Sequence, residues 1–383
     1  MTTVKMVKLG TLIKPAKLQK CGNDDYPVLS MTMHNGLVFQ SDKFKKSVAS
    51  QDKSTYKVVH RNQLVIGFPI DEGVLATQRI TDAGIVSPAY GIWDVNQTKI
   101  VPEFLEYALR CNRAIDYYKA KLRGSTARRR SLPTPTLLEL DVPLPDIEQQ
   151  RLALTTIHHA KNALDSRQAQ LTKLDELIKA RFVEMFGGYE PNAKLSDVAS
   201  ITGGLTKNSN RNKMKLKLPY LRVANVSYAK IDVSEMLEIG LTEDEKAKTL
   251  LSYDDLLFVE GNGSPDQIGR VALWKNEIIP CVHQNHLIKA RFNSHLIVPY
   301  FALHYFMSQE GREQIQGKAV STSGLYTLSV SKISNLLIPT PPLSLQNQFA
   351  AFVEEVDKSK VEVQKALDQT QLLFDSLMQQ YFG

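Results

Sequence analysis

The chain has 383 residues, of which 43% are hydrophobic, and it carries a net charge of +7 at pH 7. This length allows large buried cores and predicts two domains with connecting structure. The opening residues MTTVKMVKLG lack the apolar run of a signal peptide, and no stretch approaches the roughly 18 apolar residues of a membrane span, so we expect a cytoplasmic protein. The three cysteines, Cys21, Cys111 and Cys281, lack zinc-site spacing and are expected to be buried free thiols.

The positive charge is concentrated in two long segments. Residues 1–145 carry 21 basic against 13 acidic side chains, and residues 188–341 carry 17 against 15. Residues 146–187 carry 6 of each, and residues 342–383 carry 3 against 6. Such segregation is typical of a surface that binds a polyanion, because phosphate neutralisation supplies much of nucleic-acid affinity. Charge alone also fits an ordinary basic protein.

Residues 1–145 alternate apolar and polar side chains in the way that strands do. The runs KVVHRNQLVIGF and GIVSPAYGIW are rich in β-branched residues and are bounded by Gly, Asn, Asp and Pro. A helix is predicted over VPEFLEYALRCNRAIDYYKAKL. We expect an α+β domain built on a strongly bent antiparallel sheet.

Residues 146–187 predict a single long helix. A proline-containing segment, VPLPDIEQQ, precedes it, and proline is favoured just before a helix or in its first turn. Ile157, Leu164, Leu171, Ile178 and Met185 then recur at intervals of seven, as in a coiled coil. At 1.5 Å per residue a helix of about 36 residues would span roughly 55 Å.

Residues 188–341 and 342–383 repeat this pattern. Strands are predicted in LPYLRVANVSYAKIDV and IGRVALW, and a helix in VPYFALHYFMSQEGREQIQ. A second long helix follows IPTPPLSLQNQ. Its apolar side chains fall in two rows spaced by seven. One row consists of Val353, Leu367, Phe374 and Tyr381, together with the charged Lys360, and the other of Phe349, Val356, Val363 and Leu377, together with the polar Thr370.

A shift of 196 residues places 132–187 on 328–383 without a gap. The matches include Gln150 on Gln346 and Phe186 on Phe382, and they indicate a duplicated unit of one domain and one helix. We therefore predict two recognition domains, at 1–145 and 188–341, separated by two long antiparallel coiled-coil helices at 146–187 and 342–383 in a pseudo-twofold repeat. The alternative is that each helix packs on its own domain. Three charged side chains interrupt the helical stripe and suggest docking of another chain, namely Arg167, Arg181 and Lys360.

The candidate DNA-binding residues lie in three polar, basic stretches. Arginine can make bidentate contacts to guanine, whereas lysine and hydroxyl groups mostly hold phosphates. The first stretch, KAKLRGSTARRRS, offers Lys119, Lys121, Arg123, Ser125, Thr126, Arg128, Arg129 and Arg130, with a solvated basic loop as the alternative. The second offers Lys207, Asn208, Asn210, Arg211, Asn212, Lys213 and Lys215. The third offers Lys318, Ser321, Thr322, Ser323 and Tyr326, and weaker candidates are His34, Asn35, Lys43, Lys45 and Lys46.

The sequence lacks the common motifs of methyltransferases and of nucleotide-binding enzymes. There is no (N/D)PP(Y/F) amino-methyltransferase motif, no GxGxxG loop and no Walker sequence. His283 and His286 in HQNH have no acidic neighbour and only Cys281 nearby in the sequence, so a strand-end hydrogen-bonding role is favoured over metal binding. We expect no catalytic, cofactor or metal site on this chain.

The whole arrangement resembles the specificity subunit of type I restriction-modification enzymes. YKVVHRNQLVIGF and GIVSPAYGIW resemble its first sheet core, and LPYLRVANV, LLSYDDLLFVEGNG, IGRVALW and CVHQNHLIKARF resemble its second. PLPDIEQQRLA and PPLSLQNQFA resemble the segments that begin its spacer helices. The second segment has Ser344 and Leu345 where an acidic residue or Gln is common in the family, and this departure affects only the capping of the helix.

The resemblance implies a non-catalytic protein that reads a bipartite, asymmetric double-stranded DNA target, one half with each recognition domain. It also implies that the helices dock methyltransferase subunits, two in number, and that restriction subunits can join them. S-adenosylmethionine would then be bound by the methyltransferase, and ATP and Mg²⁺ by the restriction subunit. The alternative is a stand-alone or phage-borne DNA-binding protein of the same fold.

Overall fold

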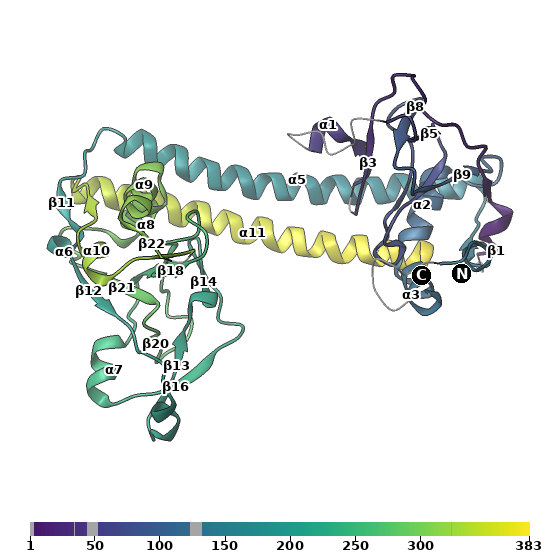
Figure 1. Ribbon diagram of the computed structural model, residues 1–383. Coiled ribbons are helices and arrows are strands. Elements are labelled where there is room, and N and C mark those ends of the chain that lie inside the picture. Colours follow the sequence, from purple (N-terminus) through teal and green to yellow (C-terminus); the bar gives the residue numbers. More distant parts are fainter. Residues whose placement is uncertain (1–3, 34, 44–52, 123–131, 323) are drawn as a thin grey trace. The chain divides into compact units, whose positions relative to one another are not determined.

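The computed structural model describes residues 4–33, 35–43, 53–122, 132–322 and 324–383. The chain divides into two compact units. The first unit consists of Met1–Gln168 and Lys365–Gly383, so both chain ends belong to it (Figure 1). The second unit consists of Ala169–Gln364. The expected α+β class, with two β-rich regions and two long packed helices, is confirmed.

Two helices of 40 residues each, α5 (Ile147–Phe186) and α11 (Leu343–Phe382), contribute one part to each unit. The side chain of Asp146 caps α5 by accepting a hydrogen bond from the Gln149 N–H at 2.8 Å. Pro342 stands at the equivalent position before α11 and has no side-chain acceptor, so the two helices begin differently although their lengths agree.

Within each unit the two helices run antiparallel. In the second unit the Phe182 ring of α5 lies 5.4 Å from the Phe349 ring of α11, and the Asp175 carboxylate accepts from Lys360 Nζ at 2.7 Å. In the first unit Ile157, near the start of α5, shares a core with Phe382 at the end of α11. The rows of seven are buried or half-buried along both helices, which confirms the expected pairing.

The first unit is built on a four-stranded antiparallel sheet in the order β2-β9-β6-β7. Its strands are β2 (Ile13–Pro15), β9 (Gly91–Val95), β6 (Leu64–Ile66) and β7 (Leu75–Thr77). Three strand pairs surround it, formed by β1 (Met6–Lys8) with β10 (Asp141–Pro143), β3 (Leu29–Thr32) with β4 (Gly36–Phe39), and β5 (Lys57–His60) with β8 (Ala83–Val86). The short helices are α1 (Gln40–Lys43), α2 (Pro102–Arg110), α3 (Asn112–Lys121) and α4 (Thr134–Leu138), with 3-10 turns at Leu9–Thr11 and Ile70–Glu72.

The second unit repeats that sheet in the order β12-β21-β17-β19, again antiparallel throughout. Its strands are β12 (Ala199–Gly203), β21 (Leu287–Phe292), β17 (Leu256–Val259) and β19 (Val271–Leu273). Position by position they correspond to β2, β9, β6 and β7. The two units therefore share one sheet topology, as a duplication predicts.

The remaining strands of the second unit form smaller sheets. These are β16 (Leu237–Gly240), β13 (Lys217–Leu221) and β20 (Val282–His283); β18 (Gly261–Asn262), β23 (Leu325–Thr327) and β22 (Val320–Thr322); β14 (Val226–Ser227) with β15 (Lys230–Ile231); and β11 (Ala193–Lys194) with β24 (Leu337–Ile338). The pair β13 and β20 is parallel, which departs from the purely antiparallel expectation. The helical segments are α6 (Leu195–Val198), η4 (Ser209–Lys213), η5 (Val223–Asn225), α7 (Glu243–Thr249), α8 (Pro299–Met307), α9 (Gln309–Lys318) and α10 (Val330–Ser334).

Each helix predicted after the sheet is in fact two helices. Cys111 separates α2 from α3 with an extended ψ of 160°, and Ser308 separates α8 from α9 with a ψ of 165°. The same break in both units turns the second helix away from the first.

The three cysteines, Cys21, Cys111 and Cys281, are free and buried, as expected. None of the helices in the described ranges is long and apolar enough to cross a membrane.

Candidate nucleic-acid interface

The first basic stretch is described only at its start. Lys119 and Lys121 are exposed at the end of α3, whose other face buries Ala114 and Tyr118 in the core of the first unit. The Tyr118 hydroxyl donates to the Leu109 carbonyl at 3.1 Å, which fixes the helix and so directs the lysines outward. The other members of the stretch lie outside the described residues, namely Arg123, Ser125, Thr126, Arg128, Arg129 and Arg130.

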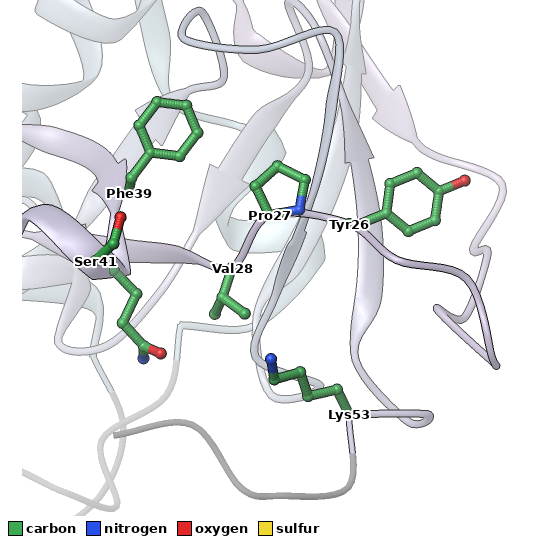
Figure 2. Close-up of a pocket in the computed structure, with 7 residues that line it drawn as sticks. Tyr26, Pro27, Val28, Phe39, Ser41 and Lys53 are labelled. Carbon is green, nitrogen blue, oxygen red and sulfur yellow. The ribbon is translucent and has the colours of Figure 1, made fainter. Parts of the chain in front are cut away.

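Two of the weaker candidates of the first unit fall within the described residues. Asn35 is exposed in the β3–β4 turn, Lys43 ends α1, and His34, Lys45 and Lys46 fall outside the described residues. Beside α1 a cavity of about 380 Å³ is lined by aromatic, amide, hydroxyl and ammonium groups (Figure 2). Its lining residues are Tyr26, Pro27, Val28, Phe39, Gln40, Ser41 and Lys53.

Arg211, a candidate of the second stretch, is buried and makes four hydrogen bonds within the second unit. Its guanidinium donates to Glu245 through two nitrogens at 2.8 and 3.1 Å, to the Gly240 carbonyl at 2.8 Å and to the Thr206 carbonyl at 2.6 Å. The hydrogen bond from Arg211 holds the pKa of the Glu245 carboxyl below its usual value. Arg211 therefore anchors the loop, and its donors are not free to read a base in this arrangement.

The rest of the second stretch is exposed around that anchor. Asn208 caps the η4 turn by accepting from the Asn210 N–H at 3.1 Å. Gly240 allows the close approach, since a Cβ there would lie 2.0 Å from the Arg211 carbonyl oxygen. The side chains held outward are those of Lys207, Asn208, Asn210, Asn212, Lys213 and Lys215.

The third stretch forms a hairpin on a braced loop. Lys318 ends α9, Ser321 is exposed on β22, and half-buried Tyr326 pairs with Asn262 of β18. The side chain of Thr322 and all of Ser323 lie outside the described part. Arg312 donates to the carbonyls of Gly269 at 3.0 Å and Asp266 at 3.2 Å, so the loop that carries β18 is held against α9.

The turn formed by residues 283–286 links the second and third stretches. Leu205, just before Lys207, donates its N–H to the His283 carbonyl at 2.9 Å. Three residues later, His286 Nδ1 lies 3.0 Å from the Glu260 carboxylate, directly before β18. No group of three metal-ligating side chains occurs in the described residues, those of HQNH included. Glu260 is a partner for His286 that sequence proximity could not reveal.

Buried polar side chains next to this turn form hydrogen bonds with backbone carbonyls of the second unit. His283 is fully buried, its Nδ1 lies 3.0 Å from the Thr249 carbonyl, and burial lowers the pKa of its imidazole to about 4. Lys289 donates to the carbonyls of Lys248 and Leu250 at 3.1 and 3.0 Å, and burial lowers its pKa to about 8. The first histidine of HQNH thus has the strand-end hydrogen-bonding role that was favoured for it.

Two of the three predicted docking residues are engaged between the long helices. Lys360 Nζ bridges Asp175 at 2.7 Å and Asp357 at 3.2 Å. Arg181 pairs with Glu184 at 2.8 Å and lies over the Phe352 ring at 5.8 Å. Both side chains therefore stabilise the helix pair of the second unit in this structure. Arg167 is half-exposed on the part of α5 that belongs to the first unit.

Two units with one sheet topology and two matching long helices define a duplicated α+β protein, which exposes basic and amide-bearing loops. Residues 188–370 match the family described as the type I restriction modification DNA specificity domain. These 183 of the 383 residues are therefore assigned to that family, and the chain is similar to specificity subunits of type I restriction enzymes.

The similar proteins agree with this assignment. The chain is 24% identical over 267 residues to the type I restriction enzyme StySPI specificity subunit of Salmonella potsdam, and 22% identical over 269 residues to the EcoKI specificity subunit of Escherichia coli; each match covers 63% of this chain and 57% of the relative. The chain thus spans about half the length of the curated relatives it matches.

A solved structure has the same fold. It comes from work on the assembly and conformational transition of the type I R-M system, and it superposes with a TM-score of 0.62 at 14% identity over 99% of this chain and 97% of that chain. A type I S subunit from M. genitalium gives a TM-score of 0.54 at 13% identity, covering all of this chain and 97% of that one.

Proposed function

We propose that this chain recognises a bipartite, asymmetric sequence in double-stranded DNA and directs methyltransferase subunits to it. The observation that carries the proposal is the duplication, because two units of one topology present different loop chemistry and would read two different half-sites. The exposed lysines of the η4 loop and of α3 and α9 suit phosphate contacts, whereas the amide groups suit base edges.

The base-contacting and phosphate-contacting residues in this proposal come from the three stretches. They are Lys119, Lys121, Arg123, Ser125, Thr126, Arg128, Arg129, Arg130, Lys207, Asn208, Asn210, Lys213, Lys215, Lys318, Ser321, Thr322, Ser323 and Tyr326. Arg211 is left out because its guanidinium is used within the fold.

Docking of partner subunits is assigned to the outer faces of the long helices. Several apolar side chains are exposed on both helices, in addition to the rows that are buried between them. They are Leu152, Leu177 and Val183 on α5, and Val361, Leu372 and Leu373 on α11. We propose two methyltransferase subunits, with bound S-adenosylmethionine, as partners on these faces, and restriction subunits, with ATP and Mg²⁺, as further members of the complex.

The test is to map DNA methylation in the source cells with and without this chain. Loss of methylation at one split, asymmetric motif is the expected result. An unchanged methylation pattern would contradict the role in modification.

Co-purification separates the proposal from the alternative, a DNA-binding protein of the same fold that acts alone. A chain that binds its target tightly but stays free of an added methyltransferase subunit would favour that alternative.

A further inference from the structure

The duplication identifies one turn at the same place in both sheets. In the first unit Ile66 at the end of β6 pairs with Gly91 at the start of β9. In the second unit Val259 at the end of β17 pairs with Leu287 at the start of β21. The residues just before those strands, Tyr90 and His286, therefore occupy equivalent positions.

Each of these two residues contacts the segment that follows the neighbouring strand, but with different chemistry. The Tyr90 ring meets the ring of Phe68, two residues after β6, edge-on at 6.2 Å. His286 Nδ1 lies 3.0 Å from the carboxylate of Glu260, the first residue after β17. A carboxylate only accepts, so Nδ1 carries the hydrogen and the opposite ring nitrogen of this exposed histidine is left for another partner.

The rest of the turn changes in the same way. The first unit has Ser87, Pro88 and Ala89 before Tyr90, and the second has Gln284 and Asn285 before His286. Side chains that build the scaffold, by contrast, match between the units, as Gln150 matches Gln346. Two domains that read different half-sites need the same scaffold but different side chains where they contact bases. The turn before β9 and β21 fits that requirement, since its side chains differ while the scaffold glutamines match.

The backbone of the second turn is fixed before any ligand binds. The Asn285 N–H donates to the Leu205 carbonyl at 3.0 Å, and the Gln284 N–H donates to the Leu221 carbonyl at 3.0 Å. Gly204 packs so tightly against this turn that a Cβ would fall 2.3 Å from the His283 carbonyl oxygen. Rigid support of this kind positions a reading side chain accurately.

The amide side chains on this fixed turn are available. Gln284 and Asn285 are half-exposed, and within the part of the chain that the structure describes their side-chain amides form no hydrogen bond. The turn lies between two candidate stretches. Leu205 leads into Lys207, and the backbone carbonyl of Glu260 accepts from the N–H of Leu328, just after β23, at 2.8 Å. Base-reading amides would thus be flanked by groups that suit phosphate contacts.

We propose that the Gln284–His286 turn is a base-reading element of the second unit, in which the amides of Gln284 and Asn285 bind adenine. A carboxamide can donate to adenine N7 and accept from its N6 amino group in the major groove. This inference rests on the proposed DNA-binding function and names a position within it.

The experiment selects binding sites from a randomised DNA library with the full chain, for the wild type and for Gln284→Ala with Asn285→Ala. We expect one or two adjacent adenine preferences in one half-site to weaken roughly 5- to 150-fold. The other half-site and the salt dependence of binding should stay unchanged. The matched control, Asn347→Ala with Gln348→Ala, removes two exposed amides of α11 in the same unit and should keep every preference.

A second variant distinguishes reading from folding. Gln284→Glu with Asn285→Asp keeps the side-chain shapes but replaces donors with acceptors, so the preference should move from adenine toward cytosine, whose amino group donates. A wild type with a bipartite preference that both variants retain would overturn this inference alone. A wild type without any sequence preference would overturn it together with the proposed function.

Discussion

Gln150 and Gln346 make the same three hydrogen bonds in the two units. Both side chains are fully buried in the first turn of a long helix. Each amide oxygen accepts a backbone N–H at 2.8 Å, and each amide nitrogen donates to two carbonyls at 3.1 and 2.8 Å. The partners are Val101, Lys99 and Pro145 for Gln150, and Val298, Leu296 and Pro341 for Gln346. Each long helix is thereby fastened to the start of α2 or α8.

Replacing one of these glutamines should destabilise its own unit. In Gln150→Leu three partly buried backbone groups lose their partner, and we expect the free energy of unfolding to fall by about 2–4 kcal/mol, measured by urea denaturation. Amide hydrogen exchange should locate the loss in the first unit. Gln149→Leu, at an exposed neighbouring position, is the control and should change little. Equal stability of the two variants would show that the bonds contribute nothing net.

Much of this fold is predictable from the sequence because it is periodic. The rows of seven and the preceding prolines predicted both long helices, and the 196-residue repeat matched Gln150 with Gln346 before their bonds were known. The break at Cys111 was not predicted, because one extended residue leaves the apolar pattern on either side intact.

The candidate site was less predictable, since it depends on distant partners. Arg211 stands in a polar, basic run and looks like a reading residue until Glu245, 34 residues later, is placed against it. Lys360 likewise suggested an interface with another chain, but Asp175 neutralises it within the helix pair. The equivalence of His286 and Tyr90 could not be predicted either, because it depends on the strand pairing in the two sheets.

The end of α11 should contribute stability to the first unit. Phe382 is buried, its ring lies 4.8 Å from that of Phe104, and its carbonyl accepts from Arg113 Nε at 3.0 Å. Phe382→Ala should lower the free energy of unfolding by about 3–5 kcal/mol through the lost contacts and the cavity. Hydrogen exchange that rises in α2 would support this, and protection unchanged there would contradict it. Leu372→Ala, at an exposed position of the same helix, serves as the control.

Two histidines, the buried His283 and the half-buried His304, should make the second unit sensitive to acid. Burial, and then the charge of Lys289, lower the pKa of His283 to about 4, with Asp255 acting in the opposite sense. Burial and Lys360 lower the pKa of His304 to about 4, opposed by Asp175. Both values lie below the 6.5 of an unfolded histidine, so the unfolded chain binds more protons. The stabilisation is present above about pH 6.5 and is lost as the pH falls toward 4.

The pH dependence can be assigned with one variant. Between pH 7 and pH 5 each histidine should remove about 2 kcal/mol from the free energy of unfolding. His304→Leu should lose its share of that dependence, whereas His295→Leu, at an exposed site of the same unit, should keep the dependence of the wild type. Identical pH profiles for all three proteins would show that His304 is protonated equally in the folded and unfolded chains.

Arg211 and its lysine neighbours should separate into a folding role and a binding role. Arg211→Met leaves the Glu245 carboxylate without its bidentate partner; because that carboxylate is one-third exposed, we expect a loss of about 1–3 kcal/mol in unfolding free energy rather than the larger cost of a fully buried pair. Lys213→Ala with Lys215→Ala should leave stability unchanged and lower the slope of log affinity for DNA against log salt by about two, one for each lost phosphate contact. Urea denaturation and DNA titrations at several salt concentrations measure both effects on each variant. If Arg211→Met had normal stability and an altered base preference, Arg211 would be a base-reading residue. Its hydrogen bonds to Glu245 would then be replaced by contacts with DNA on binding.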